Sequence, residues 1–214
     1  MIDSLSSRTG TSIQWGKSSK IQCTEKTAKS AMTDGFVERV KSLAKEDAQK
    51  GIYMDKGYLQ LQHSQMKQYV SPDRSGPMSQ ATQVLQAVAK EDDPRLELLN
   101  SLLKRLSGRI QHKDGQTLVS LGKMSGDCFG KIHHNSSGQT ADIYAPNGET
   151  IASYNSNGGG WTVIQTQEEL KFQGEADAVY AQAFREARAE LAATQQTAAL
   201  VQGSGETAGF DVQA

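Results

Sequence analysis

Hydrophobic and polar positions follow two different rhythms along the chain. Over residues 34–109 the apolar positions recur every three or four residues, which is the spacing of one face of an α-helix. Over residues 110–165 they form short runs separated by glycines and polar turns, as in β-strands. Helical spacing returns at residue 166. The pattern therefore predicts several helices, then a sheet, then one long helix.

The first two predicted helices precede a proline-containing loop. One spans residues 34–50, with Asp34 as the N-cap and Gly51 at the stopping position. The next begins at Asp55 and ends before Pro72, because the residue before a proline avoids the helical conformation. Its apolar face consists of Leu59, Met66 and Tyr69.

Two further helices are predicted before the sheet. Ser79 is expected to cap a short one after a loop over residues 73–77. The other has Asp93 as its N-cap and Gly108 just beyond its end. Its apolar stripe consists of Leu96, Leu99, Leu102, Leu103 and Leu106. A fully buried leucine contributes roughly 1.5–3 kcal/mol, so we expect this helix to anchor the others against the sheet.

The predicted sheet is an antiparallel meander, because its connections are too short for crossover helices. Asn147-Gly148 and Asn157-Gly158 supply the positive φ angles of tight hairpins. Thr166 and Glu169 have the spacing of a capping box, which places the start of the last helix directly after the final strand. Strand alternation predicts the residues that face the last helix, namely Ile143, Ile151, Trp161 and Val163.

Together these elements predict an α+β fold with N-terminal helices packed on a small antiparallel β-meander, closed by a long C-terminal helix, with flexible termini. The polar ends lack apolar periodicity and are predicted to be a flexible arm over residues 1–33 and a flexible tail over residues 195–214. Between them we expect a single domain over residues 34–194. Its mainly helical part, its meander and its last helix span residues 34–109, 110–165 and 166–194.

Composition narrows the possible partners and compartments. The formal net charge is −1, and no run of lysine and arginine forms the dense basic face that nucleic-acid binding requires. There is no Sec-type signal pattern and no apolar stretch long enough for a membrane span. Two cysteines, Cys23 and Cys128, are too few for a disulfide framework. We therefore predict a soluble protein that binds neither nucleic acid nor membrane and is cytoplasmic by default, while export without a signal peptide stays open.

Cys128, His133 and His134 are the candidates for catalytic chemistry. A thiolate beside an imidazole could act as the nucleophile of a small hydrolase or transferase. Neighbouring histidines in a strand point to opposite faces, so only one of them could join Cys128. A closed zinc site needs four ligands, and we predict neither a metal nor a cofactor. The alternative interpretation is a buried cysteine near an exposed histidine.

Tyr144, Tyr154 and Trp161 are the candidates for a binding surface, because large aromatic side chains dominate the energetics of interfaces. The same side chains could instead fill a small core. Alternation along the strands leaves Tyr144 or Tyr154 on the outer face of the sheet.

The sequence alone does not identify a function. Because no catalytic constellation stands out, we predict a non-enzymatic protein-interaction or structural protein, with a small cysteine/histidine-dependent hydrolase or transferase as the alternative. A protein partner or self-association is expected, the latter through the alanine- and glutamine-rich C-terminal helix. Flexible ends would suit an accessory or substrate of a bacterial export or appendage system, although no residue singles that out.

Overall fold

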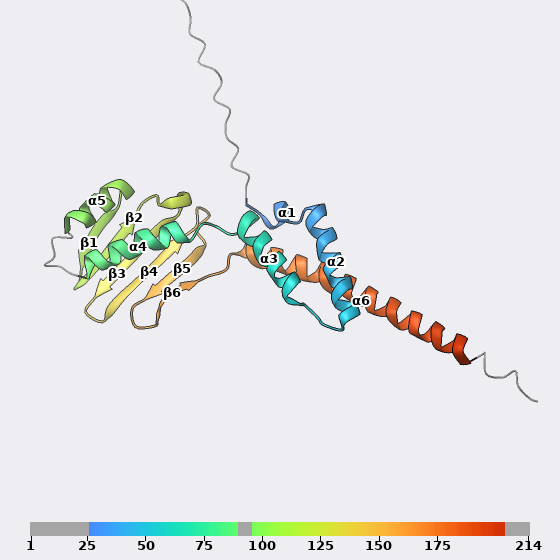
Figure 1. Cartoon of the computed structure of the whole chain (residues 1–214). Helices are drawn as coiled ribbons and strands as arrows, with labels where there is room; N and C mark the ends of the chain where they lie inside the picture. Colours follow the sequence, from blue (N-terminus) through green and yellow to red (C-terminus); the bar gives the residue numbers. More distant parts are fainter. Residues whose placement is uncertain (1–25, 90–95, 204–214) are drawn as a thin grey trace, which may run out of the picture.

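The computed structural model describes residues 26–89 and 96–203 of the 214-residue chain. The helices in this part of the chain are α1 (Ala28–Ala31), α2 (Asp34–Lys50), α3 (Lys56–Tyr69), α4 (Ser75–Val88), α5 (Leu96–Leu106) and α6 (Gln167–Gly203). The strands are β1 (Arg109–Lys113), β2 (Gln116–Leu121), β3 (Phe129–Asn135), β4 (Gly138–Tyr144), β5 (Thr150–Asn155) and β6 (Gly160–Val163). The α+β class and the order of helices, meander and long last helix are confirmed (Figure 1).

The sheet is a six-stranded meander in which each strand pairs antiparallel with its neighbours in sequence. The turn between β4 and β5 contains Gly148, whose φ of 89° favours glycine because an L side chain would be strained there. The predicted turn at this glycine is therefore confirmed. The register shifts between Ile143 and Tyr144, and the neighbouring residues Ile151 and Ala152 are both buried as a result.

Helices α4 and α5 cover one face of the sheet, and we call these two helices and the six strands the sheet lobe (Figure 1). Its buried cluster contains Val84 and Leu85 of α4, four leucines of α5, and Val119, Ile132, Ile143 and Ile151 of the strands. The leucine stripe predicted for α5 is confirmed at Leu99, Leu102, Leu103 and Leu106. Leu96, at the start of the helix, is instead 49% exposed.

Helices α1, α2, α3 and α6 form a second body with its own buried cluster, which we call the helical lobe. The rings of Phe36 in α2 and Phe172 in α6 lie 5.4 Å apart at its centre. Helix α6 thus runs away from the sheet (Figure 1), and its predicted packing against the sheet residues is wrong. Helices α4 and α5 cover the sheet instead, while α2 packs along α6. Ile143, Ile151 and Trp161 belong to the sheet cluster, and Val163 is 56% exposed.

Helix α3 buries a different face from the predicted one. Leu59 and Tyr69 are exposed, and of the predicted face only Met66 packs, partly buried, against the helical lobe. Tyr58 and Gln62 are buried instead. Both buried side chains donate hydrogen bonds to Asp177 of α6, at 2.5 Å and 2.8 Å. A hydrophobic pattern does not reveal these contacts, because they are polar and join segments that are far apart in the sequence.

Three helix ends differ from prediction by a few residues. Thr33, not Asp34, is the N-cap of α2. Helix α4 begins before Ser79, because the Asp73 carboxylate accepts the backbone N–H of Ser75 at 3.1 Å. At the end of α5, Ser107 takes the left-handed conformation, with a φ of 52°. The next backbone N–H, that of Gly108, then donates to Leu103 O at 2.7 Å.

The packed body also extends beyond both predicted boundaries. Thr27 caps α1, and Ala28 and Ala31 are buried in the helical lobe, so residues 27–33 of the predicted arm are packed. Helix α6 continues to Gly203, although it was expected to end near residue 194. The rest of the predicted arm and tail, and the predicted cap at Asp93, lie outside the described residues. No helix in the described ranges combines the length and the apolar character needed to cross a bilayer.

Candidate functional site

Cys128, the candidate nucleophile, lies in the core of the sheet lobe. Its side chain is 1% exposed, and Sγ lies 3.9 Å from the carbonyl oxygen of Gly126. Burial, with smaller contributions from the carboxylates of Asp73 and Asp127, raises the pKa of the thiol. A thiol with a raised pKa stays protonated near neutrality and is a poor nucleophile.

The structure does not bring Cys128 together with either histidine. His134 lies near the far end of β3, and at about 3.3 Å per residue the two side chains are on the order of 20 Å apart. His133 is exposed on the opposite face of the strand from the buried Ile132. Among the residues that the structure describes, no three His, Cys, Asp or Glu side chains form a group that could hold a metal ion.

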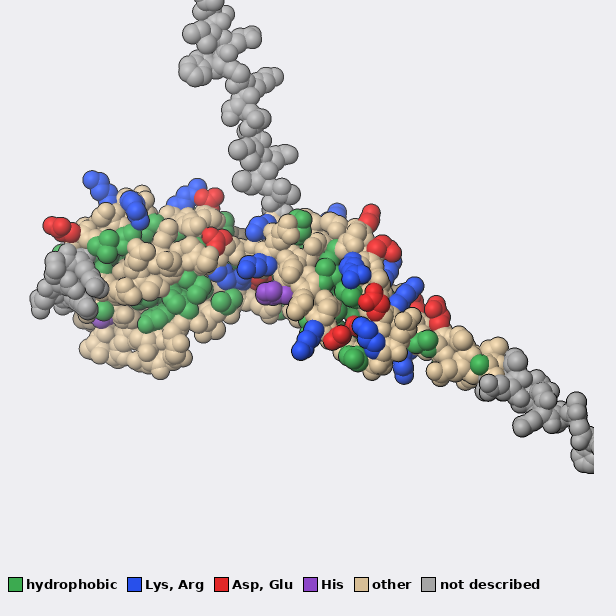
Figure 2. All heavy atoms as spheres, viewed as in Figure 1, with side chains coloured by type: hydrophobic (Ala, Val, Ile, Leu, Met, Phe, Trp, Pro, Cys, Tyr) green, Lys and Arg blue, Asp and Glu red, His purple; other side chains and the backbone are tan. Residues whose placement is uncertain are grey.

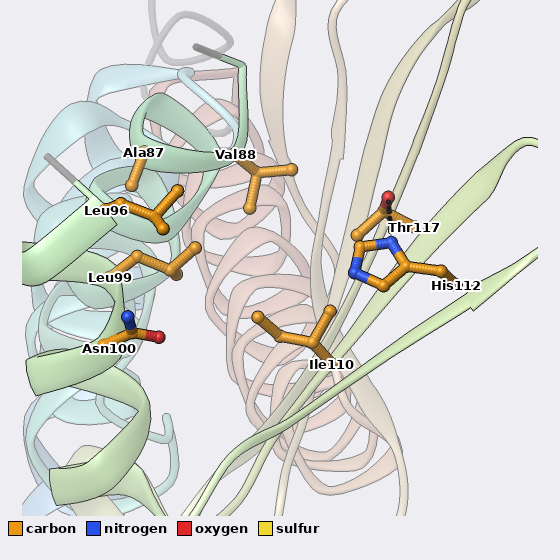
Figure 3. A pocket seen from close by; sticks show the side chains of 8 residues that line it. All are labelled: Ala87, Val88, Leu96, Leu99, Asn100, Ile110, His112 and Thr117. Carbon is orange, nitrogen blue, oxygen red and sulfur yellow. Dashed lines mark hydrogen bonds between the residues drawn. The ribbon is translucent and has the colours of Figure 1, made fainter. Parts of the chain in front are cut away.

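A small pocket opens between α4, α5 and the β1–β2 hairpin (Figure 3). Its walls are mainly apolar, and its volume is about 170 Å³. His112 Nδ1 and Thr117 Oγ1 lie 3.0 Å apart and hydrogen-bond to each other. Small-molecule sites usually measure about 300–1,000 Å³, and this pocket is too small to carry a function of that kind.

The three candidate surface aromatics lie on two faces of the sheet. The rings of Tyr154 and Trp161 are 5.4 Å apart and pack on the side of the sheet that α4 covers. Trp161 Nε1 donates to Thr82 Oγ1 of α4 at 3.0 Å. These two side chains therefore help to fill the core. Tyr144, two residues after the outward-facing Asp142, lies on the other side of the sheet.

We call the side of the sheet away from α4 and α5 the outer face; no described helix covers it. Phe129 on β3 lies directly opposite Tyr144 on β4 and is 43% exposed. Lys131 Nζ lies 5.5 Å from the centroid of the Tyr144 ring, within range of a cation–π interaction. Sequence reasoning missed Phe129, because its partner across the strands is known only once the register is known.

The charges on the outer face are mainly positive. Residues paired directly across strands share a face, so the register places Arg109, Lys131 and Asp142 in one row. Lys113 lies on the same face of β1, and all three cations are exposed. Asp142 is the one carboxylate facing outward from the described strands, and Ser153 Oγ donates to it at 2.7 Å. Partial burial, together with this carboxylate, raises the pKa of Tyr144, so its phenol stays neutral.

Arg74 and Glu169 join the two lobes. The guanidinium donates to both carboxylate oxygens, Nη1 to Oε1 at 2.9 Å and Nη2 to Oε2 at 2.5 Å. It also donates to the carbonyl oxygens of Ile151 and Ile164, at 3.0 Å and 2.8 Å. Only 13% of the Arg74 side chain and 3% of the Glu169 side chain are exposed. This pair therefore holds the lobes together and leaves little of either charge for a ligand.

No protein-family model, no curated protein and no solved structure matches the chain. The candidate sites are therefore judged on their own geometry. Among the described residues, that geometry singles out two places where exposed side chains are available for binding. One is the outer face of the sheet, and the other is a cleft between the lobes.

Proposed function

We propose that this protein is a non-enzymatic interaction protein that binds an extended segment of a partner protein on the outer face of its sheet. The observation that carries the proposal is the pairing of the exposed Phe129 with the half-buried Tyr144 beside Lys131. An antiparallel sheet often leaves one face to water, and that face is then polar. Here two aromatic rings interrupt the polar rows. Aromatic anchors of this kind supply much of the binding energy at interfaces.

The size of the outer face favours a segment over a whole subunit. Six strands spaced about 4.8 Å apart make a face roughly 25 Å wide, and strands of this length make it roughly 20 Å long. The resulting area, about 500 Å², is below the ~800 Å² that each partner buries in a standard interface. We therefore infer a peptide segment or a transient contact as the occupant.

Charge complementarity indicates which segment would fit. Arg109, Lys113 and Lys131 outnumber Asp142, whose carboxylate already accepts a hydrogen bond from Ser153. A segment with acidic residues next to an aromatic or leucine side chain would meet both features of the face. Three cations spread over the face are sparse for nucleic acid, whose binding commonly uses about 6–10 phosphate contacts.

Selection from a random peptide library displayed on phage, with the full chain as bait, tests the proposal. Enriched peptides are expected to share an acidic residue next to an aromatic or leucine. Their affinity should fall by about tenfold or more with the F129S/Y144S double variant. The L59S/Y69S control removes two exposed apolar side chains from α3 and should bind like the unmodified chain.

Two results would overturn the proposal. Peptides that bind all three proteins alike would show that the aromatic pair is not the anchor. Binding of a random single-stranded RNA pool, lost in the same double variant while no peptide is enriched, would replace the protein partner with nucleic acid.

Self-association through α6 is the second part of the proposal. Residues 192–198 of α6 are exposed, and the helix runs beyond the helical lobe (Figure 1). A helical segment without tertiary contacts is only marginally stable in water, so a second helix alongside it would stabilise it. Light scattering should give a dimer for the full chain and a monomer for a chain ending at Leu191. The same oligomeric state for both chains would contradict this assignment.

A further inference from the structure

A cleft separates the two lobes at their junction, away from the outer face of the sheet. The lobes are connected by the link from α3 to α4 and by the link from β6 to α6. The cleft has a volume of about 690 Å³, which is within the ~300–1,000 Å³ of typical small-molecule sites. Figure 2 shows basic and histidine side chains gathered at the narrow waist between the lobes. The lining residues used below are Lys26, His63, Met66, Lys67, Asp73 and Val163.

The carboxylates of the cleft are already engaged. Both oxygens of Glu169 accept hydrogen bonds from Arg74. Asp73 Oδ1 accepts from the backbone N–H and the hydroxyl of Ser75, and Oδ2 accepts from Ser125 Oγ at 3.2 Å. These hydrogen bonds, working against the effect of burial, lower the pKa of Asp73. Arg74 thus neutralises Glu169, while Asp73 remains an exposed anion that Lys26 and Lys67 outnumber.

The basic side chains of the cleft, by contrast, have few partners. His63 and Lys67 lie one turn apart on the exposed side of α3, and within the described ranges neither has a hydrogen-bond or ion-pair partner. Lys26 Nζ donates only to a neutral group, the carbonyl oxygen of Ser71, at 3.0 Å. Basic groups one helical turn apart repel each other when both are charged, and a bound anion would relieve that repulsion.

An apolar wall completes the cleft. Met66 is half-buried on the α3 side, and Val163, at the edge of the sheet, is 56% exposed on the other. A valine this exposed at an edge strand gains from contact with an apolar group. The cleft thus offers cations and apolar surface together, from both lobes.

We propose that the interlobe cleft binds a small organic anion, consisting of a carboxylate or phosphate head on an aromatic or aliphatic body. Lys67, His63 and Lys26 hold the head, and Met66 and Val163 contact the body. Because the site draws on both lobes, the bound anion also stabilises their relative placement.

The test titrates the full chain with phenyl phosphate, benzoate, inorganic phosphate and phenol while amide chemical shifts are recorded by NMR. At least one of the two aromatic anions should shift the amides of His63, Lys67 and Val163, and should bind about fivefold or more tightly than inorganic phosphate. Phenol, which lacks the charged head, should leave these amides unchanged. The tighter of the two aromatic anions identifies the head as phosphate or carboxylate.

Matched variants decide whether the cations are responsible. The H63Q/K67Q double variant should weaken binding by about tenfold, whereas the K56Q control, on the same helix but outside the cleft, should stay within about twofold. Equal weakening in K56Q would mean a diffuse charge effect and overturn the proposal. The absence of shifts at Val163, or inorganic phosphate binding as tightly as both aromatic anions, would overturn it as well.

Discussion

At the scale of single residues, two glycines allow the end of α5 to touch the sheet. A Cβ atom on Gly122 would lie 2.0 Å from the carbonyl oxygen of Leu106, and one on Gly108 would lie 2.5 Å from Leu103 Cδ2. The sequence marks Gly108 as a helix stop, but its actual role depends on close approach as well as on conformation. Nothing local to Gly122 predicts the backbone that lies against it.

Replacing Gly122 should therefore be costly. The Gly122→Ala variant is expected to lose about 1–3 kcal/mol of the free energy of unfolding, because the nearest atom is a backbone oxygen that cannot simply rotate away. The control is Gly174→Ala in α6, where a Cβ atom would meet nothing within 4 Å. This variant should raise the free energy of unfolding by about 0.5–1 kcal/mol, because glycine destabilises a helix interior relative to alanine. Urea unfolding followed by circular dichroism measures both. Equal stability of the two variants would contradict the close approach.

Cys128 should react slowly in the folded protein. Burial raises the pKa of its thiol and also shields the sulfur. In a Cys23→Ser background, so that only Cys128 can react, modification by iodoacetamide at pH 7.5 should be slow and should become fast in urea. Rapid alkylation of the native protein would revive the hydrolase or transferase alternative.

At the scale of elements, a signal that is complete within a few residues could be predicted, and one that depends on a distant residue could not. The capping box at the start of α6 is confirmed: Thr166 Oγ1 accepts the N–H of Glu169 at 3.2 Å, and Glu169 Oε2 accepts the N–H of Thr166 at 2.8 Å. Such a motif is complete within four residues. The face of α3, by contrast, is set by Asp177, far along the chain, and hydrophobic spacing alone selected the wrong side.

The buried tyrosines of the helical lobe should make it sensitive to alkali. Burial first, and then hydrogen bonds to Asp177 and Asp47 respectively, raise the pKa of Tyr58 and Tyr180 far above the ordinary value of 10.0. The pKa of each phenol is higher in the folded than in the unfolded protein. The contribution of the two tyrosines to stability is therefore complete below pH 10 and is lost as the pH rises above it. Absorbance at 295 nm should show both phenols ionising only when the protein unfolds.

Tyr180→Phe tests the same network at neutral pH. The variant leaves the buried carboxylate of Asp47 without the hydroxyl that donates to it at 2.7 Å, and should cost about 1–3 kcal/mol of the free energy of unfolding. Tyr53→Phe, at a tyrosine that is 53% exposed, is the control and should cost little. A Tyr180→Phe variant as stable as this control would show that the network is not stabilising.

At the scale of the whole molecule, the class and order of elements could be predicted from the sequence, but the division into two lobes could not. Periodicity reports which face of an element is apolar and does not say which element covers it. Helix α6 packs on α2, whereas α4 and α5 cover the sheet. The pairing of Phe129 with Tyr144 on the outer face likewise depends on register.

The Arg74–Glu169 pair should make the stability of the protein depend on pH in the acid range. Burial alone would raise the pKa of Glu169, but hydrogen bonds from Arg74, Ser71 and Thr166 lower it below its ordinary 4.5. Because the pKa of Glu169 is lower in the folded protein, its carboxylate contributes to stability above pH 4.5. That contribution is lost as the pH falls through the folded-state pKa. Thermal unfolding should therefore show stability falling below pH 4.5, and falling less steeply in Glu169→Gln.

The same variant should be less stable at pH 7 by about 3–5 kcal/mol, because it leaves a largely buried guanidinium without its counter-charge. Glu97→Gln, at an exposed position on α5, is the control and should change stability little. If the two variants matched at every pH, the junction would not depend on this pair.

The central claim, that the outer face of the sheet is the partner-binding surface, is tested most directly by mapping where a library-selected peptide binds. Amide chemical shifts of the full chain would be recorded with and without the peptide. The account predicts that the largest changes fall on Phe129, Lys131 and Tyr144 and their neighbours on β3 and β4. Changes concentrated on α6 or in the interlobe cleft, with the outer face unmoved, would contradict it.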